Sequence, residues 1–169
     1  MKKDNSRLDH KEEQIPGILV LGIGNFLLGD EGIGVHMIQY LEKKELPANV
    51  TLLDGGTGGF HLLSHLEKFP HIILIDATID EKPVGSIEVL KPVFASDFPA
   101  SLSAHEIGLK DLIETLYLLD KQPDITLVAI SVKDIQPMSV ELSGPVEQIK
   151  EDAARIILGI IDRISYPQS

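Results

Sequence analysis

Short apolar runs alternate with amphipathic segments along most of the chain. The runs typical of strands buried on both faces of a sheet are 18–21, 50–53, 71–75 and 125–130. Apolar residues recur at helical spacing over 33–41, 60–69, 103–119 and 144–164. A weaker run, 86–90, alternates apolar and polar residues, which is typical of an edge strand that can run antiparallel. Strands that alternate with helices predict an α/β fold, a doubly wound, mostly parallel five-stranded twisted sheet with helices on both faces.

Local signals refine three of these elements. The third strand is expected to stop at Asp76, the first charged residue after its apolar run. Ser103 and Glu106 have the spacing of a capping box, so His105 is expected in the first turn of its helix. Ser143 is expected to cap the last helix.

The beginning of the chain has a different pattern. Residues 1–16 carry mixed charges and no apolar period, which predicts a flexible polar tail. Residues 17–169 are then expected to form a single domain, since that length suits one hydrophobic core.

Composition narrows the classes of function. The chain has no cysteine, which excludes disulfides and thiolate metal sites and leaves His and carboxylates as metal ligands. Its formal charge of −11 disfavours nucleic acid and anionic lipid as partners. No apolar run approaches the ~20 residues of a spanning helix, so no membrane association is expected. We therefore expect a cytoplasmic protein.

Acidic residues follow the first three predicted strands. Asp30 and Glu31 come after the first strand, Asp54 after the second and Asp76 after the third, while His105 opens a later helix. Because the carboxyl ends of parallel strands meet at one edge of a doubly wound sheet, we expect these side chains to share one rim. One imidazole and two carboxylates would suit zinc, nickel or iron and leave positions open for substrate or water.

The same acids have a structural explanation. Asp near a helix start is favoured by unpaired backbone N–H groups, so spacing alone does not separate capping from metal binding. His105 is equally compatible with a plain surface position. Asp76 is the best single candidate, because it ends an apolar strand inside the sheet, where burial without a cation or donor would be costly.

The remaining histidines and Ser131 offer weaker sites. His61 and His65 stand four apart, but the glutamate of the zinc motif HExxH is missing, so a solvated helix flank is expected. His36 and His71 show no partner in the sequence and are expected at the surfaces of their elements. Ser131 lacks the glycine frame of a nucleophile elbow.

A dinucleotide site is the main competing interpretation of the glycine-rich first loop. Gly22 and Gly24 follow the first strand, and Asp54 stands where a ribose-binding acid would. Leu27, however, occupies the place of the third glycine, and two acids open the first helix where a pyrophosphate would dock. Repulsion between these carboxylates and phosphate argues against a nucleotide.

With these residues in view, the chain resembles the hydrogenase maturation endopeptidases from Ile18 to about Ile161. The segments that carry the resemblance are GIGNFLLGDEGIG (22–34), LLDGGTGG (52–59), IDA (75–77), SAHEIGL (103–109) and IQPMSVELSGPV (135–146).

The resemblance implies a twisted mixed sheet and an aspartic-type or metal-dependent endopeptidase. Such an enzyme removes the C-terminal extension of a nickel-iron hydrogenase large-subunit precursor after nickel insertion. The implied catalytic and metal-binding residues are Glu31, Asp76 and His105. Asp54 is implied in substrate recognition, and Asp30 is a second-rank candidate for that role.

The resemblance further implies that the divalent metal is nickel supplied by the precursor itself. Cleavage would then use either a metal-activated water or a carboxylate general base, with the metal in the latter case serving only to dock the substrate. The alternative to an enzyme is a nickel-sensing or nickel-delivery module that uses the same ligands without hydrolysis.

Overall fold

The computed structural model describes residues 16–100, 106–136 and 138–167. Its strands are β1 (Ile18–Gly22), β2 (Val50–Asp54), β3 (His71–Ile79), β4 (Ile87–Leu90) and β5 (Asp124–Val132). Its α-helices are α1 (Ile33–Leu41), α2 (Leu63–Leu66), α3 (Glu106–Leu118), α4 (Gly144–Gln148) and α5 (Lys150–Ser165). Short 3-10 helices are η1 (Gly29–Gly32), η2 (Phe60–Leu62) and η3 (Ala95–Asp97). All of the predicted tail except Pro16 lies outside the described ranges.

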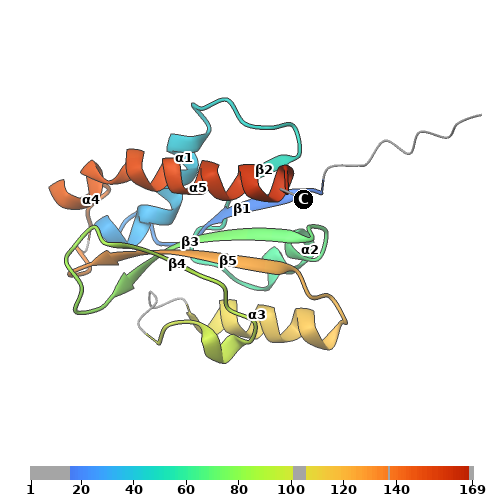
Figure 1. Ribbon diagram of the computed structural model, residues 1–169. Helices are drawn as coiled ribbons and strands as arrows, with labels where there is room; N and C mark the ends of the chain where they lie inside the picture. Colours follow the sequence, from blue (N-terminus) through green and yellow to red (C-terminus); the bar gives the residue numbers. More distant parts are fainter. Residues whose placement is uncertain (1–15, 101–105, 137, 168–169) are drawn as a thin grey trace, which may run out of the picture.

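The strands form one sheet in the order β2-β1-β3-β5-β4 (Figure 1). Neighbouring strands are parallel except for β4, which pairs antiparallel with β5 at one edge. The predicted fold is therefore confirmed, including the direction allowed for the fourth strand. Every helix in the described ranges is too short or too polar to cross a membrane.

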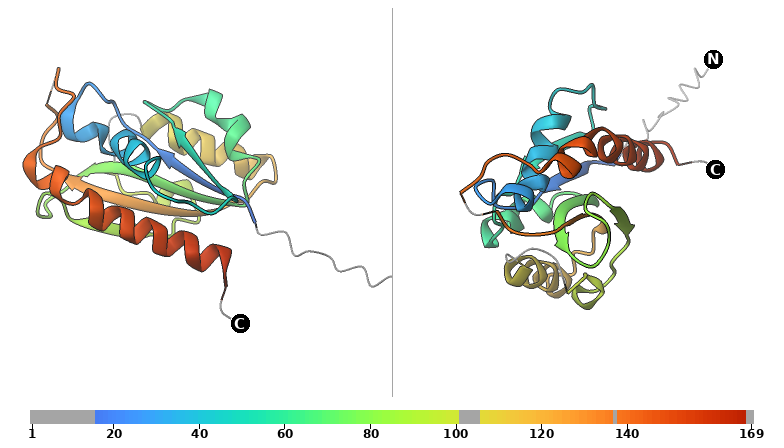
Figure 2. Two further views of the ribbon diagram at one scale, coloured as in Figure 1. Left: turned by 90° about the horizontal axis from the view of Figure 1, so that it is seen from above. Right: turned by 90° about the vertical axis from the view of Figure 1, so that its left-hand side faces the viewer.

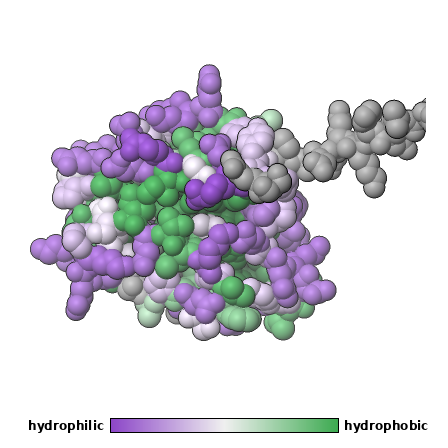
Figure 3. All heavy atoms as spheres, viewed as in Figure 1, coloured by the Kyte–Doolittle hydropathy of each residue, from purple (hydrophilic) through white to green (hydrophobic). Residues whose placement is uncertain are grey.

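Alternate side chains of the central strands point to opposite faces of the sheet and belong to two separate hydrophobic cores. On β1, Ile18 and Val20 pack with the inner faces of α1 and α5, whereas Leu19 and Leu21 pack with α2 and α3. A strand can be apolar on both faces only where helices cover both, which is the arrangement seen end-on in Figure 2. At the surface, Figure 3 shows hydrophobic residues across the middle of one face, framed by hydrophilic ones.

The third strand extends beyond its predicted end. β3 pairs with β5 over its whole length, from His71 opposite Asp124 to Ile79 opposite Val132. Asp76 therefore lies inside a strand, buried like its neighbours, and the prediction that the strand stops there was wrong. The neighbouring strand, which a local pattern does not reveal, decides where β3 ends.

Two predicted helices also differ. The helix expected over 60–69 is reduced to η2 and α2 and ends at Leu66, shortly before Pro70, which disfavours a helical residue ahead of it. The helix expected over 144–164 is broken at Ile149 into α4 and α5. Ser143 occupies the cap position of α4, but its side chain makes no capping hydrogen bond.

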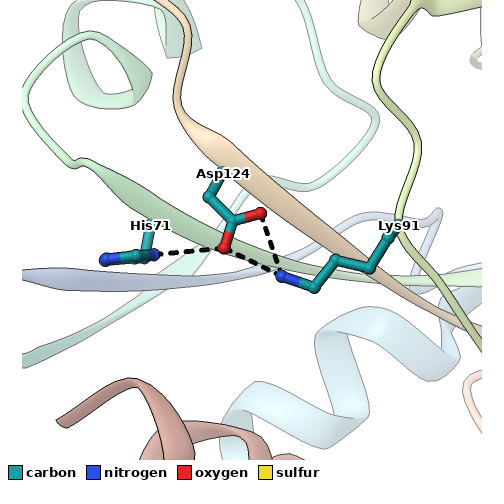
Figure 4. A network of polar contacts seen from close by, with 3 residues as sticks. All are labelled: His71, Lys91 and Asp124. Carbon is teal, nitrogen blue, oxygen red and sulfur yellow. Dashed lines mark hydrogen bonds and ion pairs between the residues drawn. The ribbon is translucent and has the colours of Figure 1, made fainter. Parts of the chain in front are cut away.

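A polar network links the amino-terminal ends of β3 and β5 (Figure 4). Lys91 Nζ donates to both carboxylate oxygens of Asp124, at 2.9 and 2.8 Å, and His71 Nδ1 lies 3.4 Å from Asp124 Oδ2. Burial raises the pKa of Asp124, but the hydrogen bonds and charge of Lys91, together with His71, outweigh it, so the pKa lies below its usual value. The network ties the starts of β3 and β5 to the segment after β4, and His71, expected to have no partner, has one.

We expect Lys91→Met to raise the pKa of Asp124, because the variant removes the main group that lowers it. A carboxyl whose pKa is lower in the folded state stabilises the fold above its unfolded pKa, and this contribution is lost as pH falls through the folded pKa. The pair is about half exposed, so the variant should lose less than about 1 kcal/mol at neutral pH and nothing in strong acid. Carboxyl titration by NMR and urea unfolding at two pH values measure this; an unchanged Asp124 pKa would contradict it.

Gly34→Ala should destabilise the fold strongly. A Cβ at Gly34 would stand 2.2 Å from the Ile23 carbonyl oxygen and 2.4 Å from that of Ile75, and backbone cannot yield as a flexible side chain can. We expect a loss of at least about 2 kcal/mol in the free energy of unfolding. Gly159→Ala in α5 is the matched control, since its Cβ would meet only Arg163 Nη1 at 3.8 Å. That variant should gain about 0.5 to 1 kcal/mol by helix propensity; similar losses in both would refute the packing argument.

Candidate active site

In a doubly wound sheet a crevice is expected where the strand order reverses, which is at the carboxyl end of β1 in this sheet. The chain leaves β1 for β2 on one side and returns to β3 on the other side of β1. In doubly wound sheets this reversal point is where ligands bind, because the two connections diverge over opposite faces. The loop after β1 and the far half of β3 border this crevice.

Close backbone packing brings the start of α1 onto the end of β1 and the middle of β3. A Cβ at Gly22 would lie 2.1 Å from the Gly34 carbonyl oxygen, and one at Gly34 would meet the carbonyl of Ile75. Two glycines are therefore required where helix and strands touch. Glu31 precedes Gly34 by about one turn, and Ile75 directly precedes Asp76, so the two acids are brought to the same place.

Glu31 and Asp76 are both withdrawn from solvent. Their exposed fractions are 1% and 2%, and both carboxylate oxygens of Glu31 are buried. The last pair between β1 and β3 joins Gly22 to Ile75, so Asp76 is the first residue of β3 beyond the end of β1. Asp76 Oδ1 accepts the N–H of Ala77 at 2.8 Å, which fixes the orientation of the carboxylate. η1, which carries Glu31, packs directly against β3.

Asp54 stands on the outer side of the same edge. It ends β2 opposite Gly22 and is exposed. Its Oδ1 accepts the N–H of Gly56 at 2.8 Å and so shapes the turn into the glycine-rich loop. That loop is also joined to the loop after β1, because Gly24 N–H donates to the Gly56 carbonyl at 2.7 Å. Asp54 is thus accessible to solvent at the end of β2.

Asp30 has a different environment from its neighbour Glu31. It is 1% exposed, and its oxygens accept the Ser143 N–H at 2.6 Å, the Ser143 hydroxyl at 2.7 Å and the Gln136 side-chain amide at 3.3 Å. The Asp30 N–H donates to Gln136 Oε1 at 3.0 Å. This buried carboxylate therefore fastens η1 to the segment that leads into α4.

Gln136 and Ser143 are the residues that sequence patterns missed. They lie 106 and 113 positions from Asp30, so no local periodicity connects them. The Ser143 hydroxyl was expected to cap α4, but it makes no capping hydrogen bond and donates to the Asp30 carboxylate. The only signal in the sequence was that both residues belong to the segment 135–146.

His36 supports the same region from α1 and is not the surface residue that was expected. Its ring stacks on Phe26, with centroids 4.7 Å apart, and its Nε2 is buried without a hydrogen-bond partner among the described residues. Burial lowers the pKa of His36 below its usual value, and nearby Lys150 lowers it further. The imidazole is therefore neutral at pH 7 and packs as a largely apolar ring.

Glu31 and Asp76 are thus both buried, on elements that pack against each other, whereas Asp54 is exposed at the end of β2. Asp30 is buried and bonded to Gln136 and Ser143. His105 lies outside the described residues, and its predicted place in a capping box lies there too. Among the residues that the structure does describe, no three His, Asp or Glu side chains form a metal-binding group. His61 and His65 are exposed, as expected, and the Ser131 hydroxyl is buried and donates to Asp80 Oδ2 at 3.1 Å.

Comparisons with known proteins show the family to which the chain belongs. The family model for hydrogenase maturation proteases matches residues 35–160. The hydrogenase 2 maturation protease of Escherichia coli K12 is 35% identical over 148 residues, which cover 85% of this chain and 90% of that protein. A putative hydrogenase maturation protease of Methanocaldococcus jannaschii is 30% identical over 154 residues, covering 86% and 97%.

Solved structures show the same relationship. The hydrogenase maturating endopeptidase HybD of Escherichia coli superposes with a TM-score of 0.80 at 34% identity, covering 87% of this chain and 93% of that one. A nickel-iron hydrogenase maturation protease of Thermococcus kodakarensis gives 0.72 at 28% identity, covering 86% and 99%. The relatives are proteases, which confirms the enzyme over the non-hydrolytic module. The chain belongs to the hydrogenase maturation protease family and is an endopeptidase of hydrogenase maturation.

Proposed function

We propose that this endopeptidase removes the C-terminal extension of a nickel-iron hydrogenase large-subunit precursor after nickel has been inserted. Glu31, Asp76 and His105 are its catalytic and metal-binding residues. The observation that carries the proposal is the burial of Glu31 and Asp76 together at the reversal point of the sheet. The relatives, which are hydrogenase maturation proteases, support a hydrogenase as the protein that is matured.

The chemistry of the crevice suits a divalent cation. Two carboxylates withdrawn from water create a strongly negative site, and a cation offsets the cost of keeping both charged. Carboxylate and imidazole ligands are compatible with nickel. His105 comes after β4 and η3 along the chain, and we propose that it completes the set. The nickel belongs to the substrate, so the protease reads the maturation state of its precursor.

Two roles are open to the carboxylates. Nickel held by the three residues would polarise the scissile carbonyl and acidify an attacking water. Alternatively, the nickel only docks the precursor, and an oxygen of Glu31 or Asp76 takes the proton from the water and passes it to the departing amide nitrogen. In both schemes the fixed Asp76 carboxylate orients the reacting groups, and closure of the crevice by the precursor excludes bulk water.

Asp54 and Asp30 contribute to substrate recognition in different ways. The exposed Asp54 contacts the precursor directly at the rim. Asp30 acts indirectly, because its carboxylate is occupied by Ser143 and Gln136, and it holds η1 in the position that aims Glu31. The charge of −11 favours a protein partner over nucleic acid, and a cytoplasmic location is part of the proposal.

Asp76→Asn should abolish processing. Nickel-loaded precursor incubated with the variant should be cleaved at least about a hundredfold more slowly, because the amide is a poor ligand and no base. Mass spectrometry of the large subunit measures the loss of the extension. Asp162→Asn, an exposed acid on α5, is the matched control and should process normally.

Further outcomes separate the schemes. Full processing by Asp76→Asn would count against both. His105→Ala that still binds the precursor but does not cleave it would favour the catalytic role of nickel, whereas loss of binding would favour docking. Complex formation by the wild-type chain without any shortening of the precursor would overturn the proposed reaction.

Asp30→Asn should lower stability, since an amide cannot accept every donor that the carboxylate accepts. We expect a loss of about 1 to 3 kcal/mol in the free energy of unfolding. Ser143→Ala removes only the hydroxyl bond and should cost about 1 kcal/mol. Urea unfolding measures both variants. An Asp30→Asn protein as stable as wild type that fails to bind precursor would show direct substrate contact instead of positioning.

A further inference from the structure

Three large apolar side chains stand exposed beside the candidate active site. Leu27 is 58% exposed, Met138 92% and Val140 47%. Leu27 comes from the loop after β1, and the other two come from the segment between β5 and α4. We call this surface the apolar shelf.

Backbone hydrogen bonds join the two halves of the shelf. Ser139 N–H donates to the Leu27 carbonyl at 3.1 Å, and Gly29 N–H donates to the Ser139 carbonyl at 2.7 Å. Leu28 and Ser139 thus form an isolated β-bridge, with Met138 and Val140 on either side of Ser139. The shelf is a joined surface and not a chance exposure of separate loops.

The shelf is built on rigid supports. Asp30 binds Gln136 and Ser143, which bracket the Met138 side of the bridge. Met138 itself has a φ of 61°, a conformation that bulky residues rarely adopt and that persists only where the surroundings hold it. Strained backbone of this kind gathers at functional sites. A solvent-exposed methionine gains nothing in folding from that strain.

The position of the shelf indicates its occupant. An endopeptidase holds a polypeptide on at least one side of the scissile bond, and the shelf is continuous through Gly29 and Asp30 with the loop that carries Glu31. Its three residues carry no charge, so they select apolar side chains and not an acidic or basic segment. A polypeptide bound in the crevice would extend over this surface.

We propose that the apolar shelf binds apolar side chains of the precursor segment next to the scissile bond and thereby determines substrate affinity. The inference rests on the proposed function, and it adds the residues that recognise the cleaved segment. Leu27, Met138 and Val140 act in binding and positioning, and they take no part in the proton transfers.

The test compares two substitutions with a matched control. Leu27→Gln with Met138→Asn removes the apolar surface, and Asn tolerates the left-handed backbone of position 138. Leu118→Gln on α3 is the control, because Leu118 is 87% exposed and belongs to neither the shelf nor the crevice. KM, kcat and the Kd for nickel-loaded precursor are measured on all proteins, together with melting temperature and sedimentation.

We expect KM and Kd to rise about tenfold or more in the double variant, with no loss of melting temperature, and to stay at the wild-type values in the Leu118→Gln control. A second double variant, Leu27→Met with Met138→Leu, keeps the surface apolar and should bind the precursor with the affinity of wild type. If wild type cleaves the precursor but the double variant has unchanged KM and Kd, the shelf proposal is wrong and the proposed function stands. An equal loss of affinity in Leu118→Gln would also overturn the shelf proposal.

Two further results are decisive. A wild-type dimer that the double variant abolishes, with Kd for the precursor unchanged, would assign the shelf to a second copy and overturn the proposal. A wild-type chain that neither binds nor cleaves any nickel-loaded precursor would overturn the proposed function, and the occupant of the shelf with it.

Discussion

The arrangement of the site depends on one contact, the direct touch of backbone on backbone between the start of α1 and the ends of β1 and β3. Gly22 and Gly34 allow it, since a Cβ at either would lie within 2.4 Å of a carbonyl oxygen. Because helix and strand meet without intervening side chains, the turn before α1 is carried down to the sheet edge. η1, which carries Glu31, is thereby packed against β3, which carries Asp76. A looser contact would leave the same acids on the surface of a loop.

Three acids at this edge are almost fully buried, and their burial has different consequences. The desolvation of Asp30 is offset within the protein by the N–H and hydroxyl of Ser143 and by Gln136. That carboxylate is committed to the fold. Glu31 and Asp76 are buried on the neighbouring elements η1 and β3, and we propose that a cation of the substrate is bound there. The opposite edge of the sheet shows the contrasting solution, since Asp124 is held by Lys91 and His71 in partly exposed, purely structural pairs.

Much of this organisation could be predicted from the sequence, because strands buried on both faces and a helix such as α1 leave strong periodic signals. Parallel strand ends then imply a shared rim for the acids that follow them. The end of β3 could not be predicted, since it is set by pairing with β5. The early end of α2 had a local signal in Pro70, whereas the break between α4 and α5 at Ile149 had none. The partners of Asp30 were invisible for a related reason, as only the folded chain brings Ser143 to it across 113 positions. The place of His105 among the ligands stays a prediction.

The bridge between Leu28 and Ser139 links recognition to chemistry in a single rigid unit. The segment that exposes Met138 and Val140 is bonded to the backbone on both sides of Leu28, and through Asp30 to the turn that carries Glu31. A peptide bound on this surface would therefore be held in a fixed position relative to η1, because hydrogen bonds join the two segments. Binding energy gained at a distance from the scissile bond can then be used to orient the reacting groups. A buried carboxylate that appears merely structural would in this way contribute to the alignment of the catalytic one.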